Sequence, residues 1–279
     1  MIPTLYVVAT PIGNLSDISF RAVEILQAVD CIAAEDTRHS RRLMDFHAIQ
    51  TPLISYHEFG GEFQLNQVLK RLKSGESVAL ISDAGTPLIS DPGYKLVVQA
   101  KEEGIKIVPV PGASAVITAL SVSGLPTDEF SFHGFLPSKQ KARQDVLSQF
   151  IESPVTAVVY ETPHRILACL KDMRVLFGED RKVCLVRELT KTFETIELKP
   201  IGELCDWVEA DNNQQKGEMV VVISGVKTTV QSELTADAEA LALSLLEYMP
   251  PKAISKIVAE HKNVNKKDVY NFLLSLKSS

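Results

Sequence analysis

The sequence has few cysteines, no long apolar run and no excess of positive charge. Its four cysteines have no CxxC spacing, so we expect reduced thiols in the protein core rather than disulfide bonds. Neither they nor the six histidines show a metal-ligand spacing, so we expect no metal ion. No stretch approaches the roughly 20 uninterrupted apolar residues that a membrane span requires. The net charge of -6 confines any nucleic-acid contact to local basic patches.

The composition is that of a globular protein. Apolar residues make up 45% of the chain and charged residues 23%, which argues against disorder, collagen and coiled coil. A length of 279 residues predicts about two domains. The first residues enter a strand pattern without a basic leader, so we expect no export signal and a cytoplasmic location.

Short β-branched runs alternate with amphipathic segments along the first part of the chain. The runs that predict strands are Leu5–Ala9, Cys31–Ala34, Pro52–Tyr56, Val78–Ser82 and Ile105–Val110. The segments with helical spacing are Ile18–Val29, Glu62–Lys73 and Tyr94–Glu103. This alternation predicts an α/β fold with a mostly parallel sheet and helices on its faces.

A second set of strands and helices begins near Phe130. The strands are predicted at Ser131–Phe135, Val155–Tyr160, Val183–Arg187 and Met219–Ile223, and the helices near Ala142–Ile151 and Arg165–Leu176. The turn-rich segment 123–128 lies between the two sets and is a plausible hinge. We therefore predict two α/β domains, 1–122 and 123–228.

The tail, residues 234–279, has no glycine and no strand pattern. Its helical stretches are Ala236–Tyr248, Ala253–Glu260 and Lys267–Leu276, with Pro251 well placed at a helix start. The side chains from residue 252 onward have a balance of +4. The tail is therefore either an all-helical cap with a solvated lysine face or an accessory module that contacts phosphates. In the second case the contacts would be made by Lys256, Lys262, Lys266 and Lys267.

Ligands of parallel α/β sheets bind outside the carboxyl ends of the strands, so the loops there are the candidate site. The loop after the first strand, 10–14, has neither GxGxxG nor a P-loop, which weakens a dehydrogenase or NTPase assignment. Segment 83–93 has two prolines, two glycines and two aspartates, which predict a stiff loop. In it we expect Asp83 to accept hydrogen bonds from a ligand, although it could instead accept them from loop amides or form only an Asx-turn. We expect Asp91 to be a helix N-cap.

The other loops are also rich in small or polar residues. Segment 111–115 opens a helix with small side chains, which let a ligand approach the backbone or simply allow tight helix–sheet packing; Ser114 adds a hydroxyl. In the second half, polar clusters occupy 160–165, 187–194 and 216–219.

These motifs together resemble one known family. They are Pro-x-Gly-Asn-Leu-x-Asp-Ile at 11–18, Ser-Asp-Ala-Gly-Thr-Pro at 82–87, Pro-Gly-x-Ser-Ala at 111–115, Tyr-Glu-x-Pro-His-Arg at 160–165, Arg-Glu-x-Thr-Lys at 187–191 and Lys-Gly-Glu at 216–218. In this order they are similar to the tetrapyrrole methylase superfamily. Within it they resemble the branch that methylates small-subunit ribosomal RNA, to which Glu-Asp-Thr-Arg at 35–38 and the lysine-bearing tail also correspond.

The resemblance implies a cofactor, a fold and a substrate. Such proteins are homodimers of two α/β domains that hold S-adenosylmethionine in the cleft between them. This branch methylates the ribose 2′-hydroxyl of a decoding-region cytidine in 16S rRNA, which suggests a 30S subunit partner. Porphyrin-modifying relatives carry Gly-Asp-Pro at 82–84, where this chain has Ser-Asp-Ala, which argues against a tetrapyrrole substrate. The cofactor contacts implied by motif are Pro11, Asp83, Ala84, Gly85, Thr86, Ser114, Ala115, Tyr160, Glu161, Glu218 and Met219.

Candidate catalytic residues follow from the chemistry of methyl transfer. A neutral ribose hydroxyl is a poor nucleophile, so a proton acceptor or a cation near its oxygen should help. The candidates are Glu35, Asp36, Glu161, Glu188 and Lys191, each of which could equally form a salt bridge or a helix cap. A lysine would have to be neutral to act as a base.

Candidate RNA contacts lie in two further basic clusters, each of which could equally be a solvated surface. They are Arg38, Arg41 and Arg42 at helical spacing, and Lys139, Lys141 and Arg143 beside the hinge. Two other functions stay open: a small-molecule methyltransferase for corrinoids or porphyrins with the same fold, and a non-catalytic RNA-binding assembly protein.

Overall fold

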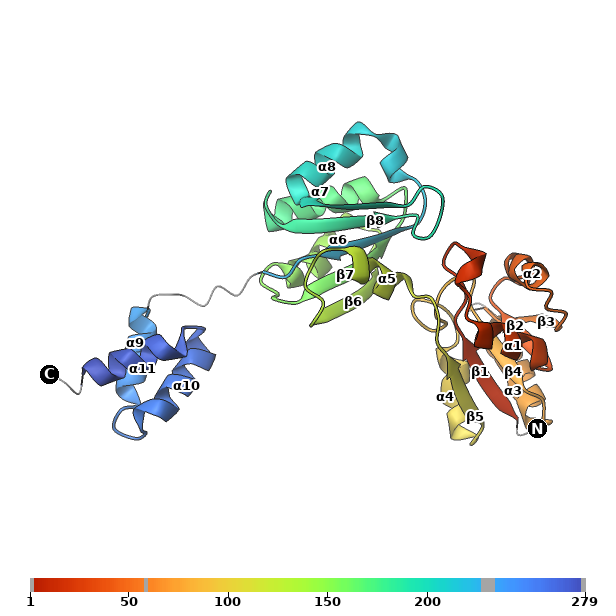
Figure 1. Ribbon diagram of the computed structural model, residues 1–279, viewed down its shortest axis with the longest axis horizontal. Coiled ribbons are helices and arrows are strands. Elements are labelled where there is room, and N and C mark those ends of the chain that lie inside the picture. Colours follow the sequence, from red (N-terminus) through yellow and green to blue (C-terminus); the bar gives the residue numbers. More distant parts are fainter. Residues whose placement is uncertain (1–2, 58–59, 227–233, 277–279) are drawn as a thin grey trace. The chain divides into compact units, whose positions relative to one another are not determined.

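A computed structural model describes residues 3–57, 60–226 and 234–276 (Figure 1). The chain forms two compact units, Met1–Gly225 and Val226–Ser279. The first unit contains two five-stranded sheets, and the elements in the described part of the second, residues 234–276, are helices. The finer division of the first unit at residues 122 and 123 stays a prediction. Within the described ranges, no helix is long and apolar enough to cross a lipid bilayer.

The first sheet is entirely parallel, as the alternation of strands and helices predicts. Its order is β3-β2-β4-β1-β5. The strands are β1 (Thr4–Val8), β2 (Cys31–Ala34), β3 (Leu53–Ser55), β4 (Val78–Ile81) and β5 (Lys106–Val110). The helices are α1 (Phe20–Ala28), α2 (Thr37–Phe46), α3 (Gly61–Lys73) and α4 (Tyr94–Glu102), and a short 3-10 turn, η1, spans Leu15–Asp17.

Both faces of this sheet are buried. In β4, Val78 and Leu80 pack under α3 and α4, whereas Ala79 and Ile81 pack under α1 and α2. Side chains of a strand alternate between faces, so a strand buried on both sides needs a continuous apolar run. That requirement explains why the central strand reads Val-Ala-Leu-Ile.

The second sheet corrects the expectation of mostly parallel strands. Its order is β6-β7-β10-β8-β9, and only β6 and β7 are parallel. The strands are β6 (Phe130–Phe135), β7 (Thr156–Glu161), β8 (Lys182–Arg187), β9 (Thr195–Pro200) and β10 (Met219–Ile223). Segment 188–194 joins β8 to β9 as a hairpin, and a short connection of this kind requires antiparallel strands.

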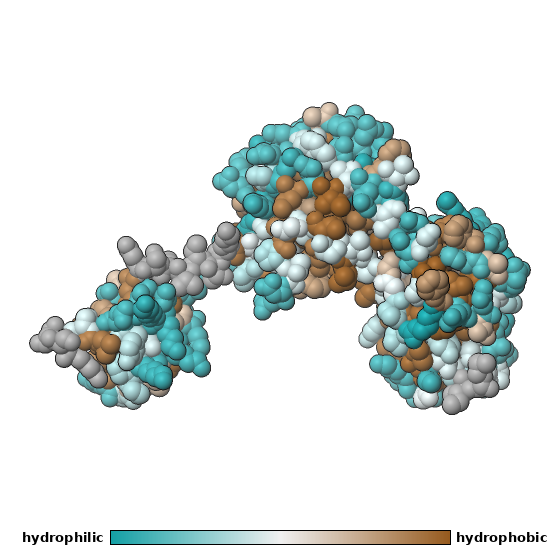
Figure 2. Space-filling view, in the orientation of Figure 1, coloured by the Kyte–Doolittle hydropathy of each residue, from teal (hydrophilic) through white to brown (hydrophobic). Residues whose placement is uncertain are grey.

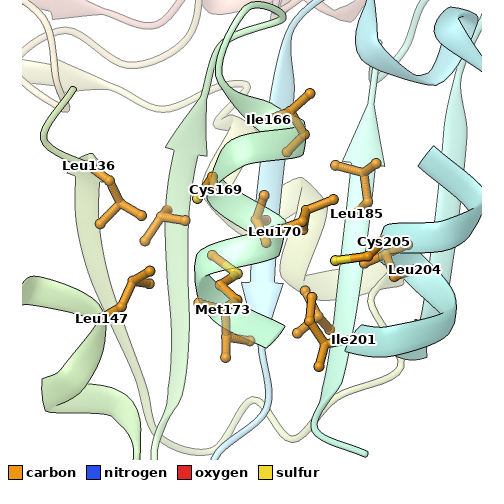
Figure 3. Packing of buried hydrophobic residues seen from close by; sticks show 14 of the residues in the cluster. Leu136, Leu147, Ile166, Cys169, Leu170, Met173, Leu185, Ile201, Leu204 and Cys205 are labelled. Carbon is orange, nitrogen blue, oxygen red and sulfur yellow. The ribbon is translucent and has the colours of Figure 1, made fainter. Parts of the chain in front are cut away.

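The helices of the second sheet are distributed unevenly. They are α5 (Ala115–Val122), α6 (Gln140–Leu147), α7 (Ile166–Phe177) and α8 (Ile201–Ala210), with 3-10 turns η3 (Ser148–Phe150) and η4 (Asn212–Gln215). Three of them, α6, α7 and α8, cover one face, where Figure 3 shows Met173 of α7 between Leu147 of α6 and Ile201 of α8. Only α5 packs on the opposite face.

The second unit is a three-helix module with its own small core. The helices are α9 (Ala236–Ser244), α10 (Pro251–Lys262) and α11 (Lys266–Ser275). Pro251 begins α10, as predicted. Asn263, in the left-handed conformation with φ 51°, ends α10, and the side chain of Asn265 caps α11 by accepting from the N–H of Lys267 at 2.8 Å. The buried residues of these helices form one cluster.

Candidate functional site

A cavity of about 270 Å³ lies between the loops of the first sheet and the strand ends of the second. The first half of the unit contributes Ile12, Ala84, Gly85, Thr86, Ile89, Ser90, Asp91, Ser114 and Ala115 to its lining. The second half contributes Phe135, Tyr160, Glu161, Thr162, Pro163, Val186, Leu189, Gly217, Glu218, Met219 and Val220. On the side of the first sheet, the cavity therefore lies at the carboxyl ends of parallel strands, where ligands of α/β sheets bind.

The loop after β4 has unusual backbone geometry. Leu88 and Ser90 have φ of 74° and 65°, in the left-handed region that residues with a side chain rarely adopt. A Cβ on Gly93, at φ 131°, would come within 2.8 Å of a Leu80 methyl carbon, so only glycine fits there. Such conformations persist only where the surroundings hold them, and they cluster at ligand sites.

Hydrogen bonds fix this loop to its neighbours. Thr10 and Gly85 exchange backbone hydrogen bonds at 2.8 and 3.1 Å. The hydroxyl of Thr86 donates to the carbonyl of Ala113 at 3.1 Å, which joins the loops after β4 and β5. These contacts shape the first wall of the cavity before any ligand binds.

Asp83 forms hydrogen bonds that connect the loop after β4 to the loop after β2. Its carboxylate accepts the N–H of Asp36 at 3.0 Å, and its own N–H donates to Glu35 at 3.4 Å. Asp83 does not line the cavity, and neither does Pro11, which is buried. Asp36 in turn caps α2 by accepting from the N–H groups of Arg38 and His39, and these hydrogen bonds lower its pKa. The loop after β4 is thereby tied to the start of the basic helix α2.

Asp91 is not the helix cap that the sequence suggests; that interpretation is wrong. The N-cap of α4 is Gly93, and Asp91 lines the cavity instead. The extra residues Pro92 and Gly93 separate Asp91 from the first turn, so its carboxylate is free to face the ligand space. Burial, followed by the nearby acidic Glu35 and Asp83, raises the pKa of Asp91 to about 6, against a hydrogen bond from Ser82.

The second wall begins with Tyr160 and Glu161 at the end of β7. Burial and the charge of Asp91 raise the pKa of Tyr160 to about 12, so its hydroxyl keeps its proton. The ring of Tyr160 packs edge-on against Phe132 and Phe135, with centroids 4.9 and 5.4 Å apart. The side chain of Glu161 is fully buried and pairs with Arg165, with Nε 3.1 Å from Oε1.

Glu188, Lys191 and Glu218 form an ion-pair network at the rim of the second wall. Nζ of Lys191 donates to Glu188 and to Glu218, each at 2.9 Å. Burial opposes both charges. Even so, these hydrogen bonds hold the pKa of Glu188 below its usual range and raise that of Lys191. Lys191 therefore keeps its proton, which removes it as a candidate base.

A second cavity of about 470 Å³ lies on the other side of Ser90 and Asp91, which line both cavities. Its lining consists of Tyr56, His57, Gly61, Glu62, Leu65, Ser90, Asp91, Pro92, Gly93, Tyr94 and Lys95. It opens beside α3 and α4 of the first half. Sequence reasoning missed this cavity because its residues come from segments that only the fold brings together.

The basic residues divide into exposed and committed side chains. Arg38, Arg41 and Arg42 are exposed on α2, and Lys139 and Lys141 are exposed around the start of α6. Of these, Arg38 lies 3.4 Å from Asp36 and Lys141 lies 3.0 Å from Asp145, in exposed ion pairs. Arg143, predicted as part of the second basic cluster, is instead buried and pairs with Asp172 at 2.6 Å. Its position on the inner face of α6 explains this correction.

The helical unit shows the same division among its lysines. Lys262 pairs with Asp237 at 2.5 Å, and Lys256 lies 3.9 Å from Glu260. Lys266 and Lys267, at the start of α11, are exposed, and no ion pair is found for them among the residues that the structure describes.

Two known protein families match the chain. The tetrapyrrole (corrin/porphyrin) methylase family matches residues 4–205, and the RsmI C-terminal HTH domain matches residues 232–277. The solved structure of a uroporphyrin-III-C-methyltransferase from Thermus thermophilus covers 80% of this chain and 94% of its own, with a TM-score of 0.56 and 18% identity. Diphthine synthase matches 79% of this chain and 90% of its own, with a TM-score of 0.60 and 15% identity. The chain belongs to the tetrapyrrole methylase family.

Two relatives are more similar still and match almost the whole chain. One, from Pseudomonas aeruginosa, is 51% identical over 269 residues, covering 96% of this chain and 95% of its own. The other, from Vibrio cholerae, is 47% identical over 270 residues, covering 97% and 94%. Both are named ribosomal RNA small subunit methyltransferase I. The chain is thus a methyltransferase of this family, whose methyl donor is S-adenosylmethionine.

The first cavity suits that donor. Its apolar lining, including Ile12, Val186 and Met219, can cover a flat base, and its peptide groups can pair with polar ligand atoms. The described lining residues include no lysine or arginine that would repel the positive sulfonium and ammonium groups. Within the described part of the chain, no group of three or more His, Cys, Asp or Glu side chains is placed to hold a metal ion.

Proposed function

We propose that this methyltransferase modifies the ribose 2′-hydroxyl of a decoding-region cytidine in 16S rRNA, acting on the 30S subunit in the cytoplasm. The observation that carries the proposal is the 47–51% identity, over nearly the full chain, to relatives named for small-subunit ribosomal RNA. Neither a tetrapyrrole enzyme nor a non-catalytic RNA-binding protein accounts for that similarity together with a cavity suited to the donor.

The two walls of the first cavity would hold S-adenosylmethionine. Gly85, Thr86, Ser114 and Ala115 line one side, and Tyr160, Glu161, Glu218 and Met219 the other. When bound, the donor supplies a methyl group on a positively charged sulfur, which an attacking oxygen can displace in line. Most of the acceleration can come from holding that oxygen close to the methyl carbon. The loop after β4 has residues at positive φ and is hydrogen-bonded to the loop after β5, so it provides a rigid surface for this positioning.

RNA contact is proposed for exposed basic side chains near the cavity and in the helical unit. Arg38, Arg41 and Arg42 are carried by α2, whose first turn is tied to the cavity loop through Asp36 and Asp83. Lys139 and Lys141 form a second group, and Lys266 and Lys267 a third at the start of the second helix of a helix-turn-helix. Cations at these places can neutralise phosphates and release counterions.

A homodimer is proposed from the face of the second sheet that α5 covers only in part. Figure 2 shows apolar residues gathered over this half of the first unit. The exposed apolar residues of the face are Ile117 and Val122 of α5, Phe130 of β6, and Ile196 and Leu198 of β9. On β9 they lie opposite residues of β8 that pack under α5, so they share its face. An apolar sheet face of this kind is usually covered by a further layer.

Light scattering tests the dimer. Wild-type protein should have twice the 30.7 kDa chain mass, and Leu198→Asp should shift it towards one chain mass. A wild-type mass of one chain at micromolar concentration would reject the dimer without affecting the proposed reaction.

Methyl transfer from tritiated S-adenosylmethionine tests the function. Purified protein is offered 30S subunits, protein-free 16S rRNA and a precorrin in parallel. We expect tritium in the RNA of the subunits, with less in free rRNA because its decoding region lacks the assembled shape. Transfer to the precorrin alone would identify a small-molecule enzyme. Absence of donor binding in calorimetry would indicate a non-catalytic protein.

A further inference from the structure

The wall between the two cavities contains one ionisable side chain that reaches both. Ser90 and Asp91 are the residues that the linings share, and of these only Asp91 can carry a charge. The first cavity suits the methyl donor. The second, about 470 Å³, has aromatic and polar residues at its edges, including Tyr94 with 71% of its surface exposed. An acceptor nucleoside that entered the second cavity would meet Asp91 before it met the donor.

Among the residues that the structure describes, no cation lines the first cavity beside Asp91. Glu35 and Asp83 act on it electrostatically from the loops after β2 and β4, and neutral Tyr160 faces it from β7. Glu161 and Glu218 line the same cavity but are held by Arg165 and Lys191. Besides Asp91, the titratable or charged groups on the second cavity, among the residues that the structure describes, are Tyr56, His57, Glu62, Tyr94 and Lys95.

The other acidic candidates are committed to structural contacts. Asp36 caps α2 and Glu188 accepts both from Lys191 and from the N–H of Glu218. Glu35 accepts from the N–H of Asp83. A carboxylate whose pKa lies near neutral pH is suited to receive a proton during a reaction, and Asp91 is the one in this site with a pKa raised to about 6.

We propose that Asp91 is a catalytic residue that accepts the proton of the hydroxyl to be methylated, and that this hydroxyl arrives through the second cavity. The inference rests on the proposed function. The hydroxyl oxygen forms a bond to the methyl carbon, whose bond to sulfur breaks with its electron pair staying on sulfur. The O–H bond breaks and its proton moves to Asp91, which becomes a neutral acid.

Asp91→Asn tests the residue, because it keeps the shape of the side chain and removes its proton affinity. We expect single-turnover methylation of 30S subunits to fall by about 100-fold, in line with general-base catalysis. Donor affinity by calorimetry should stay within threefold. A rate loss below tenfold, or a loss matched by weaker donor binding, would overturn the proposal, the latter making Asp91 a donor contact. Asp206→Asn, an exposed acid on α8, is the matched control and should keep the wild-type rate.

The protonation of the Asp91 carboxyl group can also be measured directly, without an activity assay. In protein labelled with ¹³C at the aspartate carboxyl carbon, the resonance missing from Asp91→Asn should titrate near pH 6 in the free enzyme. Titration near pH 4 would contradict the role. The wild-type single-turnover rate should also fall on the acidic side, and Asp91→Asn should lack that fall.

Tyr94→Ala tests the route through the second cavity. We expect a higher KM for 30S subunits with donor affinity unchanged, since Tyr94 lines only the second cavity. An unchanged KM would place the acceptor elsewhere and overturn this part of the proposal. Failure of the proposed function is a separate result, because it leaves wild-type protein unable to label 16S rRNA. Failure of the inference instead leaves Asp91→Asn nearly as fast as the wild type.

Discussion

The two walls of the donor cavity use carboxylates in opposite ways. In the wall from the second sheet, Glu161 pairs with Arg165, and Lys191 bridges Glu188 and Glu218. In the wall from the first sheet, Asp91 faces the acidic Glu35 and Asp83 instead. The pKa of Glu188 is accordingly lowered and that of Asp91 raised. The comparison separates carboxylates that hold the fold together from one that is destabilised and available for chemistry.

The largest effect is expected from breaking the ion pair of the fully buried Glu161 carboxylate. Arg165→Met leaves the fully buried Glu161 carboxylate without its cation, so the free energy of unfolding should fall by about 3–5 kcal/mol. Urea unfolding followed by fluorescence of Trp207, the single tryptophan, reports on this half of the unit. Arg174→Met, which breaks two exposed pairs with Glu179 and Asp206, is the control and should cost much less, because water screens exposed pairs. Equal losses would show that Glu161 is not held by Arg165.

Replacing Lys191 should have a smaller effect on the free energy of unfolding, and this effect should depend on pH. Lys191→Met should cost about 1–2 kcal/mol at pH 7, because two carboxylates lose a charged donor. The lowered pKa of Glu188 means that its share is present above the ordinary glutamate pKa and is lost as pH falls through the folded value. The raised pKa of Lys191 keeps its share intact up to alkaline pH. The difference from wild type should therefore shrink towards pH 3, and an undiminished cost there would contradict the ion pairing.

Asp91→Asn should stabilise the protein, whereas Arg165→Met and Lys191→Met destabilise it. Because the folded pKa of Asp91 is raised to about 6, ionisation destabilises the folded state as pH rises from about 4 through 6. Removing the charge should raise stability by about 1 kcal/mol at pH 8, after allowance for solvent screening, and by nothing at pH 4. Thermal unfolding at the two pH values measures this. A variant less stable than wild type at pH 8 would mean that Asp91 has a cationic partner in the folded protein.

The smallest effects are expected in the helical unit, where the same distinction between paired and unpaired charges predicts how single lysines contribute to binding of 30S subunits. Lys266→Gln and Lys267→Gln should weaken binding to 30S subunits and make its salt dependence shallower by about one log unit per lost phosphate contact. Lys262→Gln is the matched control, because Lys262 is already paired with Asp237. Donor affinity should be unchanged in all three. Identical salt dependence for wild type and variants would make the helical unit a cap rather than an RNA contact.

The sequence predicted the first sheet well because local signals and the final fold agree there. Each strand is a short apolar run, and each connection is long enough for a helix, so alternation implies parallel strands. In the second sheet, β9 was missed although Thr195–Pro200 alternates apolar and charged residues as a half-buried strand does, because the segment is only six residues long and directly follows a polar cluster. Missing that strand hid the hairpin that makes the sheet mostly antiparallel.

The sequence identified the loops that form the site but not the role of each residue in them. Motifs located the segments around Gly85, Ser114 and Tyr160, which do line one cavity. They gave Asp91 the role of a helix cap, which was wrong, and they could not show that Asp83 bonds to Glu35 and Asp36, because those residues come from another strand end. Arg143 was misjudged for a similar reason, since its partner Asp172 lies 29 residues away on α7.

Mass spectrometry of nucleosides tests the central claim most directly. Subunits from cells that lack the enzyme are incubated with purified protein and S-adenosylmethionine carrying a trideuterated methyl group, and their 16S rRNA is digested to nucleosides. The account predicts a single new species, cytidine with the deuterated methyl group on its ribose. A label on a base, on another nucleoside, or absent from the RNA despite donor binding would contradict it.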